Sequence, residues 1–262
     1  MTKQVMIVTG GSNGMGKAMA QTFAKDGAYV TISGRDEERL RQAKQEIEQF
    51  EGQVLTVPMD VRDPELVQRM VDETIAQFGT ITGLVNNAAG NFLVPAEKLS
   101  QNGWNSVIDI VLNGTWHVTQ AVGKHWIETE TKGSVVNIIA TYAWTGGPGV
   151  VHSASAKAGV LAMTKTLAVE WGAKYGIRFN AIAPGPVEGT GGVDKLIQSE
   201  QAHKMALKSV PVGRFGQVEE IARLASYLLS EEGAYINGSC VTIDGGQSIS
   251  QSGFQTGAAA FL

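Results

Sequence analysis

The sequence predicts a single doubly wound α/β domain built on a seven-stranded parallel sheet. Short apolar runs alternate with longer segments of helical periodicity along almost the whole chain, as repeated strand–helix–strand units require. Most of these runs are apolar on successive residues, which is typical of strands covered by helices on both faces. A chain of 262 residues is long enough to bury one large core and does not require a second domain.

The expected strands are residues 5–10, 28–34, 53–60, 82–90, 133–139, 177–185 and 239–246. The expected helices between them are residues 15–26, 36–50, 64–78, 103–126, 153–175 and 218–229. Pro64 follows Asp63 and fits the first turn of its helix. Right-handed crossovers would join these elements into one sheet. We therefore expect one domain over residues 1–246, followed at 247–262 by a tail for which the sequence leaves open whether it folds back.

Composition excludes several classes of partner and cofactor. A formal net charge of −4 argues against nucleic acid as the main partner. The single Cys240 cannot form an internal disulfide or supply the thiolates of an iron–sulfur cluster, and the histidines show no metal-ligand spacing, so no metal site is expected. No window approaches the roughly 18 uninterrupted apolar residues of a membrane span, and the first residues lack a signal-peptide pattern. We expect a cytoplasmic protein with no membrane contact.

The first strand ends in a glycine-rich turn that opens a helix. The turn reads Thr9-Gly-Gly-Ser-Asn-Gly-Met-Gly16. Glycines allow a tight turn and a close backbone approach to a pyrophosphate, whose charge then meets the helix N-terminus. Because a strand precedes the turn and a helix follows it, the turn predicts a dinucleotide site rather than a structural turn alone. The residues expected to contact the cofactor here are Gly10, Ser12, Asn13, Gly14, Met15 and Gly16.

The end of the second strand indicates which dinucleotide is preferred. NAD-binding proteins usually place an acidic residue there for the ribose hydroxyls, whereas this chain has Ser33-Gly34-Arg35. The Arg35 guanidinium is suited to a charge-assisted bond with a 2′-phosphate, although a solvated arginine at a helix start is the alternative. The pattern favours NADP.

Several motifs together resemble the short-chain dehydrogenase/reductase superfamily over residues 5–246. They are the glycine turn, Asp60-Val61, the stretch Asn86-Asn-Ala-Ala-Gly90, the Lys157-Ala-Gly segment and Pro184-Gly-Pro186. The resemblance implies a Rossmann-type fold, with the cofactor also lined by Asp60, Val61, Asn87, Ala88, Gly90, Lys157, Pro184 and Gly185.

Three of the four residues that usually carry catalysis in the superfamily are replaced in this chain. Ala140, Ser153 and Val111 stand where a serine, a tyrosine and an asparagine are usual. The replacements resemble the 2,4-dienoyl-CoA reductase branch, as do Asn86–Phe92, Asp109–Thr115, Tyr142–Gly146, Ser153–Gly159 and Ala168–Gly172. That resemblance implies an NADPH-dependent reductase of 2,4-dienoyl-CoA thioesters in fatty acid β-oxidation. Its catalytic residues would be Asn91, Tyr142, Ser153 and Lys157.

Each catalytic assignment has a structural alternative. Tyr142 is alternatively an aromatic of the cleft wall, Ser153 a small residue at a helix start, and Asn91 a loop cap. Lys157, one turn after Ser153 on the expected helix, would hold the nicotinamide ribose and keep the local potential positive, with a place on a solvated helix face as its alternative. His152 is more readily explained by packing or capping than as an acid.

Residues 186–213 are expected to form a lid over an elongated substrate, with Lys195, Lys204 and Lys208 placed to meet CoA phosphates. An ordinary solvated helix is the alternative there. The long helices at 103–126 and 153–175 resemble the subunit contacts of the superfamily, which implies a homotetramer. Two other functions stay open: a different short-chain reductase of a carbonyl or enoyl substrate, and a non-catalytic NADP-binding protein.

Overall fold

The computed structural model describes residues 3–50, 52–191 and 199–250. Within these residues seven strands form one parallel sheet in the order β3-β2-β1-β4-β5-β6-β7, which confirms the predicted fold class. The strands are β1 (Val5–Thr9), β2 (Tyr29–Gly34), β3 (Val54–Pro58), β4 (Gly83–Asn86), β5 (Ser134–Ile138), β6 (Arg178–Pro184) and β7 (Cys240–Ile243). All of them lie inside the predicted runs. The chain reverses its direction across the sheet between β1 and β4, where doubly wound folds bind their ligands.

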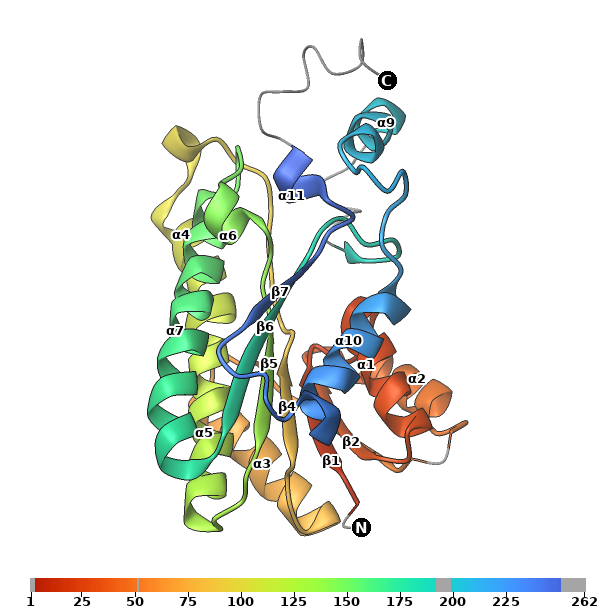
Figure 1. Cartoon of the computed structure of the whole chain (residues 1–262), viewed down its shortest axis with the longest axis vertical. Coiled ribbons are helices and arrows are strands. Elements are labelled where there is room, and N and C mark those ends of the chain that lie inside the picture. The colour runs from red at the N-terminus through yellow and green to blue at the C-terminus, as the bar shows by residue number, and fades with distance from the viewer. Residues whose placement is uncertain (1–2, 51, 192–198, 251–262) are drawn as a thin grey trace.

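Helices cover both faces of this sheet (Figure 1). The predicted helices are found as α1 (Gly14–Lys25), α2 (Glu37–Ile47), α3 (Pro64–Phe78), α7 (Val151–Tyr175) and α10 (Val218–Leu229). Shorter elements that the sequence did not predict are η1 (Ala96–Lys98), α6 (Tyr142–Thr145), η3 (Glu231–Gly233) and α11 (Gln247–Ser250). The segment 186–213 contains the helix α9 (Glu200–Lys208). No helix in the described part of the chain is long and apolar enough to cross a membrane.

The segment predicted as one helix over 103–126 is three elements. It consists of α4 (Gln101–Ile108), a π-helical turn η2 (Asp109–Asn113) and α5 (Gly114–Glu128). Two side-chain hydrogen bonds accompany the π-helical turn. Asn113 Nδ2 donates to Asp109 Oδ1 at 2.9 Å, and the Thr115 hydroxyl donates to the Val111 carbonyl at 2.6 Å. A single π turn keeps the apolar face continuous, so the sequence pattern did not reveal the break.

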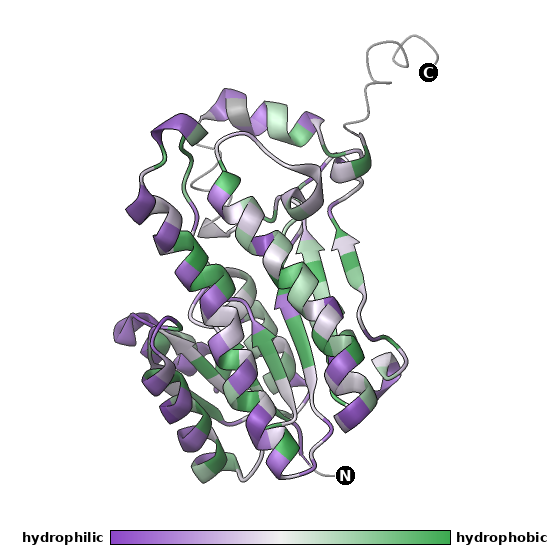
Figure 2. Ribbon diagram, turned by 90° about the vertical axis from the view of Figure 1, so that its left-hand side faces the viewer, coloured by the Kyte–Doolittle hydropathy of each residue, from purple (hydrophilic) through white to green (hydrophobic). Residues whose placement is uncertain are grey.

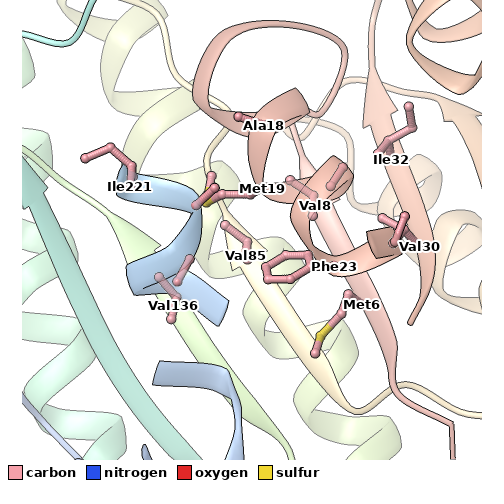
Figure 3. Close-up of a cluster of buried hydrophobic side chains, with 14 of the residues drawn as sticks. Met6, Val8, Ala18, Met19, Phe23, Val30, Ile32, Val85, Val136 and Ile221 are labelled. Carbon is pink, nitrogen blue, oxygen red and sulfur yellow. The ribbon is translucent and has the colours of Figure 1, made fainter. Parts of the chain in front are cut away.

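The core lies in two layers, one on each side of the sheet. On one side, Met19 and Phe23 of α1 and Ile221 of α10 pack against sheet residues that include Val8 and Val85 (Figure 3). On the other side, α3, α5 and α7 bury a second cluster around Trp126, whose indole donates to the Ile81 carbonyl at 2.7 Å. The strands are mainly hydrophobic, while the helices alternate between polar and apolar residues (Figure 2). This packing holds the carboxyl ends of the strands in place as a rigid rim.

Residues that directly follow Gly246 pack against the rest of the domain. Gln247 of α11 donates from Nε2 to Ser209 Oγ at 2.8 Å, and the Ser250 hydroxyl donates to the Ser209 carbonyl at 3.0 Å. The expected tail over 247–262 therefore begins with a helix that contacts the segment after α9. Residues 251–262 lie outside the described residues.

Candidate active site

A cavity of about 920 Å³ opens at the carboxyl ends of the strands. It has the size of a small-molecule site and lies where the order of the strands reverses. All four residues expected to carry catalysis line it, as do fourteen of the fifteen expected to contact the cofactor. The four residues expected to carry catalysis are Asn91, Tyr142, Ser153 and Lys157. The fourteen expected to contact the cofactor are Gly10, Ser12, Asn13, Gly14, Met15, Arg35, Asp60, Val61, Asn87, Ala88, Gly90, Lys157, Pro184 and Gly185.

The glycine turn fits a pyrophosphate. Gly10 and Gly14 have φ values of +63° and +50°, a region that favours glycine. The N-cap residue Asn13 makes no side-chain hydrogen bond to the first turn of α1. The N–H groups of that turn therefore have no side-chain acceptor and point to a position where a bound anion is stabilised.

Gly16, the fifteenth residue expected to contact the cofactor, does not line the cavity. A Cβ on Gly16 would overlap the carbonyl oxygen of Gly10 and the side chain of Asn87. Gly16 instead allows α1 to approach the end of β1 closely, which is the packing role of a third glycine in such turns. The motif alone did not distinguish this role from cofactor contact.

The end of β2 presents two cations to the cavity rather than one. Arg35 and Arg39 both line it, and Arg39 also pairs with Asp36, its Nε 3.3 Å from Oδ2. Ser33 Oγ is buried beside them and has no hydrogen-bond partner among the described residues. Two guanidinium groups and an unpaired hydroxyl fit a phosphate. Sequence reasoning missed Arg39, although it stands one helical turn after Arg35.

Asp60 is held in its charged form at the cavity wall. Its carboxylate accepts from the Arg62 guanidinium at 2.6 Å, and these hydrogen bonds, against some desolvation, lower the pKa of Asp60 below its usual value. Next to it, Val61 is buried and its carbonyl lies 3.1 Å from Nδ1 of His117. Asp60 is thus a fixed, ionised acceptor for a donor on a bound ligand.

The stretch after β4 is tied to the glycine turn. Asn87 Nδ2 donates to the carbonyls of Thr9 and Gly10 at 3.1 and 3.0 Å, and the N–H groups of Asn87 and Ala88 donate to the Thr9 hydroxyl at 3.0 and 3.1 Å. The Asn87 side chain therefore supports the cofactor cradle by holding the turn.

Tyr142 and Ser153 meet in the cavity although they belong to different helices. Tyr142 begins α6, immediately after β5, and Ser153 lies in the first turn of α7. Their hydroxyl oxygens are 3.0 Å apart. Burial raises the pKa of Tyr142, and the hydrogen bond to Ser153 opposes this shift. The phenol is therefore neutral at physiological pH and is available as a hydrogen-bond donor.

Lys157 is a buried amine one turn beyond Ser153 on α7. Its Nζ donates to the Ile138 carbonyl at the end of β5, at 2.5 Å. Burial lowers the pKa of Lys157 to about 8. The amine is thus still largely charged at neutral pH. It loses its proton at a lower pH than the amine of an ordinary lysine does.

Asn91 offers an unused donor at the cavity wall. Its Oδ1 accepts from the Phe92 N–H at 2.9 Å, while its Nδ2 is buried without a partner among the described residues. The neighbouring His152 is fully buried and does not line the cavity. Its ring meets the Phe92 ring edge-on, with centroids 4.5 Å apart, and burial lowers its pKa. This position agrees with the packing role expected for His152.

Several other lining residues come from parts of the chain where the sequence shows no motif. They include Ile139, Thr141, Val187, Thr190, Ala206 and Gln247. Thr190 and Ala206 belong to the segment expected to cover the substrate, and that role stays a prediction. Lys195, expected to meet CoA there, lies outside the described residues. The described part of the chain contains no group of three His, Cys, Asp or Glu residues that could hold a metal ion.

Comparisons with known proteins agree on the family. The family described as enoyl-(acyl carrier protein) reductase matches residues 10–248. A relative from Bacillus subtilis, named probable 2,4-dienoyl-CoA reductase [(2E)-enoyl-CoA-producing], is 57% identical over 94% of this chain and 97% of its own length. A peroxisomal 2,4-dienoyl-CoA reductase [(3E)-enoyl-CoA-producing] from Danio rerio is 39% identical over 94% of this chain and 82% of its own. A crystal structure of a short chain dehydrogenase from Bacillus anthracis has 61% identity and a TM-score of 0.90, covering 95% of this chain and 98% of that one.

The packing of Gly16 predicts how two glycine substitutions will differ. Gly16→Ala should lower the free energy of unfolding by about 1–3 kcal/mol, because the new methyl group meets a backbone carbonyl that cannot easily move, and it should weaken dinucleotide binding. Gly191 also lines the cavity, but none of the described residues lies within 4 Å of an added Cβ, so Gly191→Ala should leave the stability unchanged. Urea unfolding measures both, and equal stability of the two variants would contradict the packing role.

Proposed function

The chain belongs to the short-chain dehydrogenase/reductase superfamily, and from this premise we propose that it reduces 2,4-dienoyl-CoA thioesters to enoyl-CoA with NADPH. One observation carries this proposal: a neutral phenol, Tyr142, reaches Ser153 from the turn after β5, at 3.0 Å. Val111, the residue in place of the usual asparagine, is 1% exposed and apolar. The site keeps the cofactor elements of the superfamily and replaces its alcohol–ketone residues by a different set of donors.

The site residues fit the chemistry of a conjugated thioester. A nicotinamide bound in this cavity would supply the hydride for the far end of the diene, and negative charge would then develop on the thioester oxygen. Tyr142, as a neutral hydroxyl, and Asn91, through its unpaired Nδ2, donate to that oxygen. Such preorganised donors are often the largest single contribution to catalysis. A proton from water then completes the product carbon.

Lys157 and Ser153 support this arrangement in two ways. The charged Lys157 amine stabilises the negative charge that develops on the substrate, and its position at the cavity wall supports a second role in holding the nicotinamide ribose. Ser153 links the Tyr142 hydroxyl to solvent or to the substrate. Tyr142, Ser153 and Lys157 all follow β5, whereas Asn91 lies on the loop after β4. The substrate would therefore be held between these two segments of the chain.

NADPH is the proposed cofactor because of the charges at the end of β2. Arg35 and Arg39 line the cavity there, and Ser33 Oγ has no partner among the described residues. A 2′-phosphate would accept from these groups, whereas an unphosphorylated ribose would not use the second cation.

We also propose that residues 186–213 cover the substrate and that the protein forms a homotetramer. Lys204 and Lys208 are exposed on α9, although Lys204 pairs with Glu200 at 2.7 Å. Ala206 between them lines the cavity, which supports a contact between this helix and CoA. Val169 of α7 is 75% exposed and would be covered in an assembly. Light scattering would determine the molar mass. The cytoplasmic location stays a prediction.

The deciding experiment follows NADPH oxidation with a 2,4-dienoyl-CoA, an enoyl-CoA and a 3-ketoacyl-CoA under the same conditions. We expect turnover with the dienoyl substrate and little with the other two. Turnover with the 3-ketoacyl or the enoyl substrate alone would show a different short-chain reductase. Tight NADPH binding without turnover of any of them would favour a non-catalytic protein.

Replacing Tyr142 tests the role of the phenol. Tyr142→Phe keeps the ring but removes the hydroxyl, so kcat should fall by about two orders of magnitude or more, with little change in NADPH binding. Ser153→Ala should cost less, because water can replace a relay hydroxyl, and Lys157→Ala should impair both NADPH binding and rate. Steady-state kinetics and a fluorescence titration with NADPH measure these effects. A Tyr142→Phe enzyme with near-parental kcat would place the donor elsewhere.

Replacing Arg35 tests the cofactor preference. The parent protein should bind NADPH about tenfold to a hundredfold more tightly than NADH, the value of one charge-assisted hydrogen bond, and Arg35→Ala should shrink this ratio. Arg39→Ala should shrink it less, since Arg39 is shared with Asp36. Fluorescence titrations with both nucleotides measure the ratio. Equal affinities in the parent protein would contradict the assignment.

The lowered pKa of Lys157 predicts the pH dependence of the reaction. In the free enzyme the amine is charged below its pKa of about 8 and loses its charge above it. The value of kcat/KM, which reports the free enzyme, should therefore decline as the pH rises through about 8. In Lys157→Met, kcat/KM should be lower than in the parent protein and should not decline in this pH range. A parental profile that stays flat well above this pH would be evidence against the role of the charge.

A further inference from the structure

Two uncharged segments extend from the catalytic residues toward the surface. Residues 91–95 follow β4, and residues 147–153 join α6 to α7; together we name them the apolar seam. The Val94 N–H donates to the Gly149 carbonyl at 3.0 Å, and a Cβ on Gly149 would lie 3.3 Å from Leu93 Cδ2. The Phe92 ring packs on His152. The two segments thus lie side by side, with Asn91 and Ser153 at their inner end.

The apolar seam exposes large apolar side chains. Phe92 is 37% exposed, Leu93 52% and Val151 39%. Single exposed hydrophobic residues need no explanation, but a group of them beside a cavity is typical of a binding surface. The group adjoins the cavity, because Asn91 and Ser153 belong to the same two segments and line it, whereas Phe92, Leu93 and Val151 lie outside its lining.

The apolar seam suits a hydrocarbon rather than a phosphate. Neither segment contains a Lys, Arg, Asp or Glu residue. His152 is its single titratable side chain; it is fully buried, and burial lowers its pKa. No cation of the seam is therefore available to a CoA phosphate.

Exposed cations near the cavity lie on other elements. Arg35 and Arg39, assigned above to the cofactor, line the cavity at the end of β2. Lys204 and Lys208 are on α9, and Figure 1 shows α9 and α6 on opposite sides of the upper end of the sheet. An acyl-CoA has one highly charged end and one hydrocarbon end. The arrangement gives the bound thioester a direction, with CoA toward α9 and the alkyl tail toward the apolar seam.

We propose that the apolar seam binds the alkyl tail of the substrate beyond the conjugated double bonds and makes the enzyme selective for longer acyl chains. This inference rests on the proposed function. It extends that function by naming the part of the substrate that selects chain length and the residues that contact it.

The test compares 2,4-hexadienoyl-CoA with 2,4-decadienoyl-CoA. A fully buried methylene contributes about a factor of four, and one-sided contact about a factor of two, so the four added carbons should raise kcat/KM about tenfold or more. In Leu93→Ser, kcat/KM for the longer substrate should fall about fivefold, while the value for the shorter one and the affinity for NADPH should stay near those of the parent.

Two positions on α7 provide a matched control. Val151→Thr places a hydroxyl in the apolar seam without changing side-chain shape, so it should lower kcat/KM for the longer substrate only. Val169→Thr makes the same change toward the other end of α7, where the side chain is 75% exposed in the single chain. Provided that light scattering shows the molar mass of the parent protein, this variant should change neither value. An equal effect of both variants would contradict the proposal.

The outcomes separate this inference from the proposed function. If the parent enzyme reduces neither dienoyl substrate, the proposed function is wrong and the inference falls with it. If it reduces both with equal kcat/KM, the function stands and the role of the seam is wrong. If Leu93→Ser lowers the molar mass measured by light scattering, a second copy of the chain covers this surface, and the alkyl-tail proposal is rejected.

Discussion

The hydrogen bonds between Thr9 and the residues after β4 are the constraint on which the rest of the site depends. The Thr9 hydroxyl accepts from two successive N–H groups, and Asn87 donates back to the end of β1. These bonds join the first and fourth strands where their connections leave the sheet in opposite directions. The cofactor cradle begins on one side of this junction, and the loop that ends in Asn91 begins on the other. Loosening the junction would move both halves of the site at once.

Burial sets the protonation states of Tyr142 and Lys157, the two titratable groups at the centre of the site. The same low-dielectric surroundings that raise the pKa of Tyr142 lower the pKa of Lys157, because burial always disfavours the charged form. Near neutral pH the phenol is therefore uncharged, and the amine keeps most of its charge. One physical effect thus prepares a hydrogen-bond donor and a positive potential side by side, with no carboxylate among the described residues that meets either group in a salt bridge.

The sequence predicted the sheet and most of its helices because their periodicities differ clearly. Of the fourteen expected cofactor residues that line the cavity, the glycine turn and the end of β2 indicated six, and the family resemblance implied the other eight. Three features escaped prediction for physical reasons. The π turn at Asp109–Asn113 keeps an apolar face continuous, so no pattern marks it. Gly16 and its neighbouring glycines look alike in sequence but differ in what a Cβ would meet. Arg39 and Gln247 reach the cavity only through tertiary packing. The meeting of Tyr142 with Ser153 came from family resemblance, since spacing alone allowed a cleft-wall role.

The four proposed catalytic residues all lie between Asn91 and Lys157, whereas the glycine turn, Arg35 and Asp60 precede them in the chain. The groups proposed to select the nucleotide therefore come before those proposed for substrate chemistry, and only Lys157, Pro184 and Gly185 join the expected cofactor site from the later part of the chain. Mutation or recombination in the later part would alter the reaction while leaving the choice of reductant intact. For protein engineering, this separation makes the middle third of the chain the place for substitutions that change the substrate. The first third would be kept unchanged, because it selects the nucleotide that supplies the hydride.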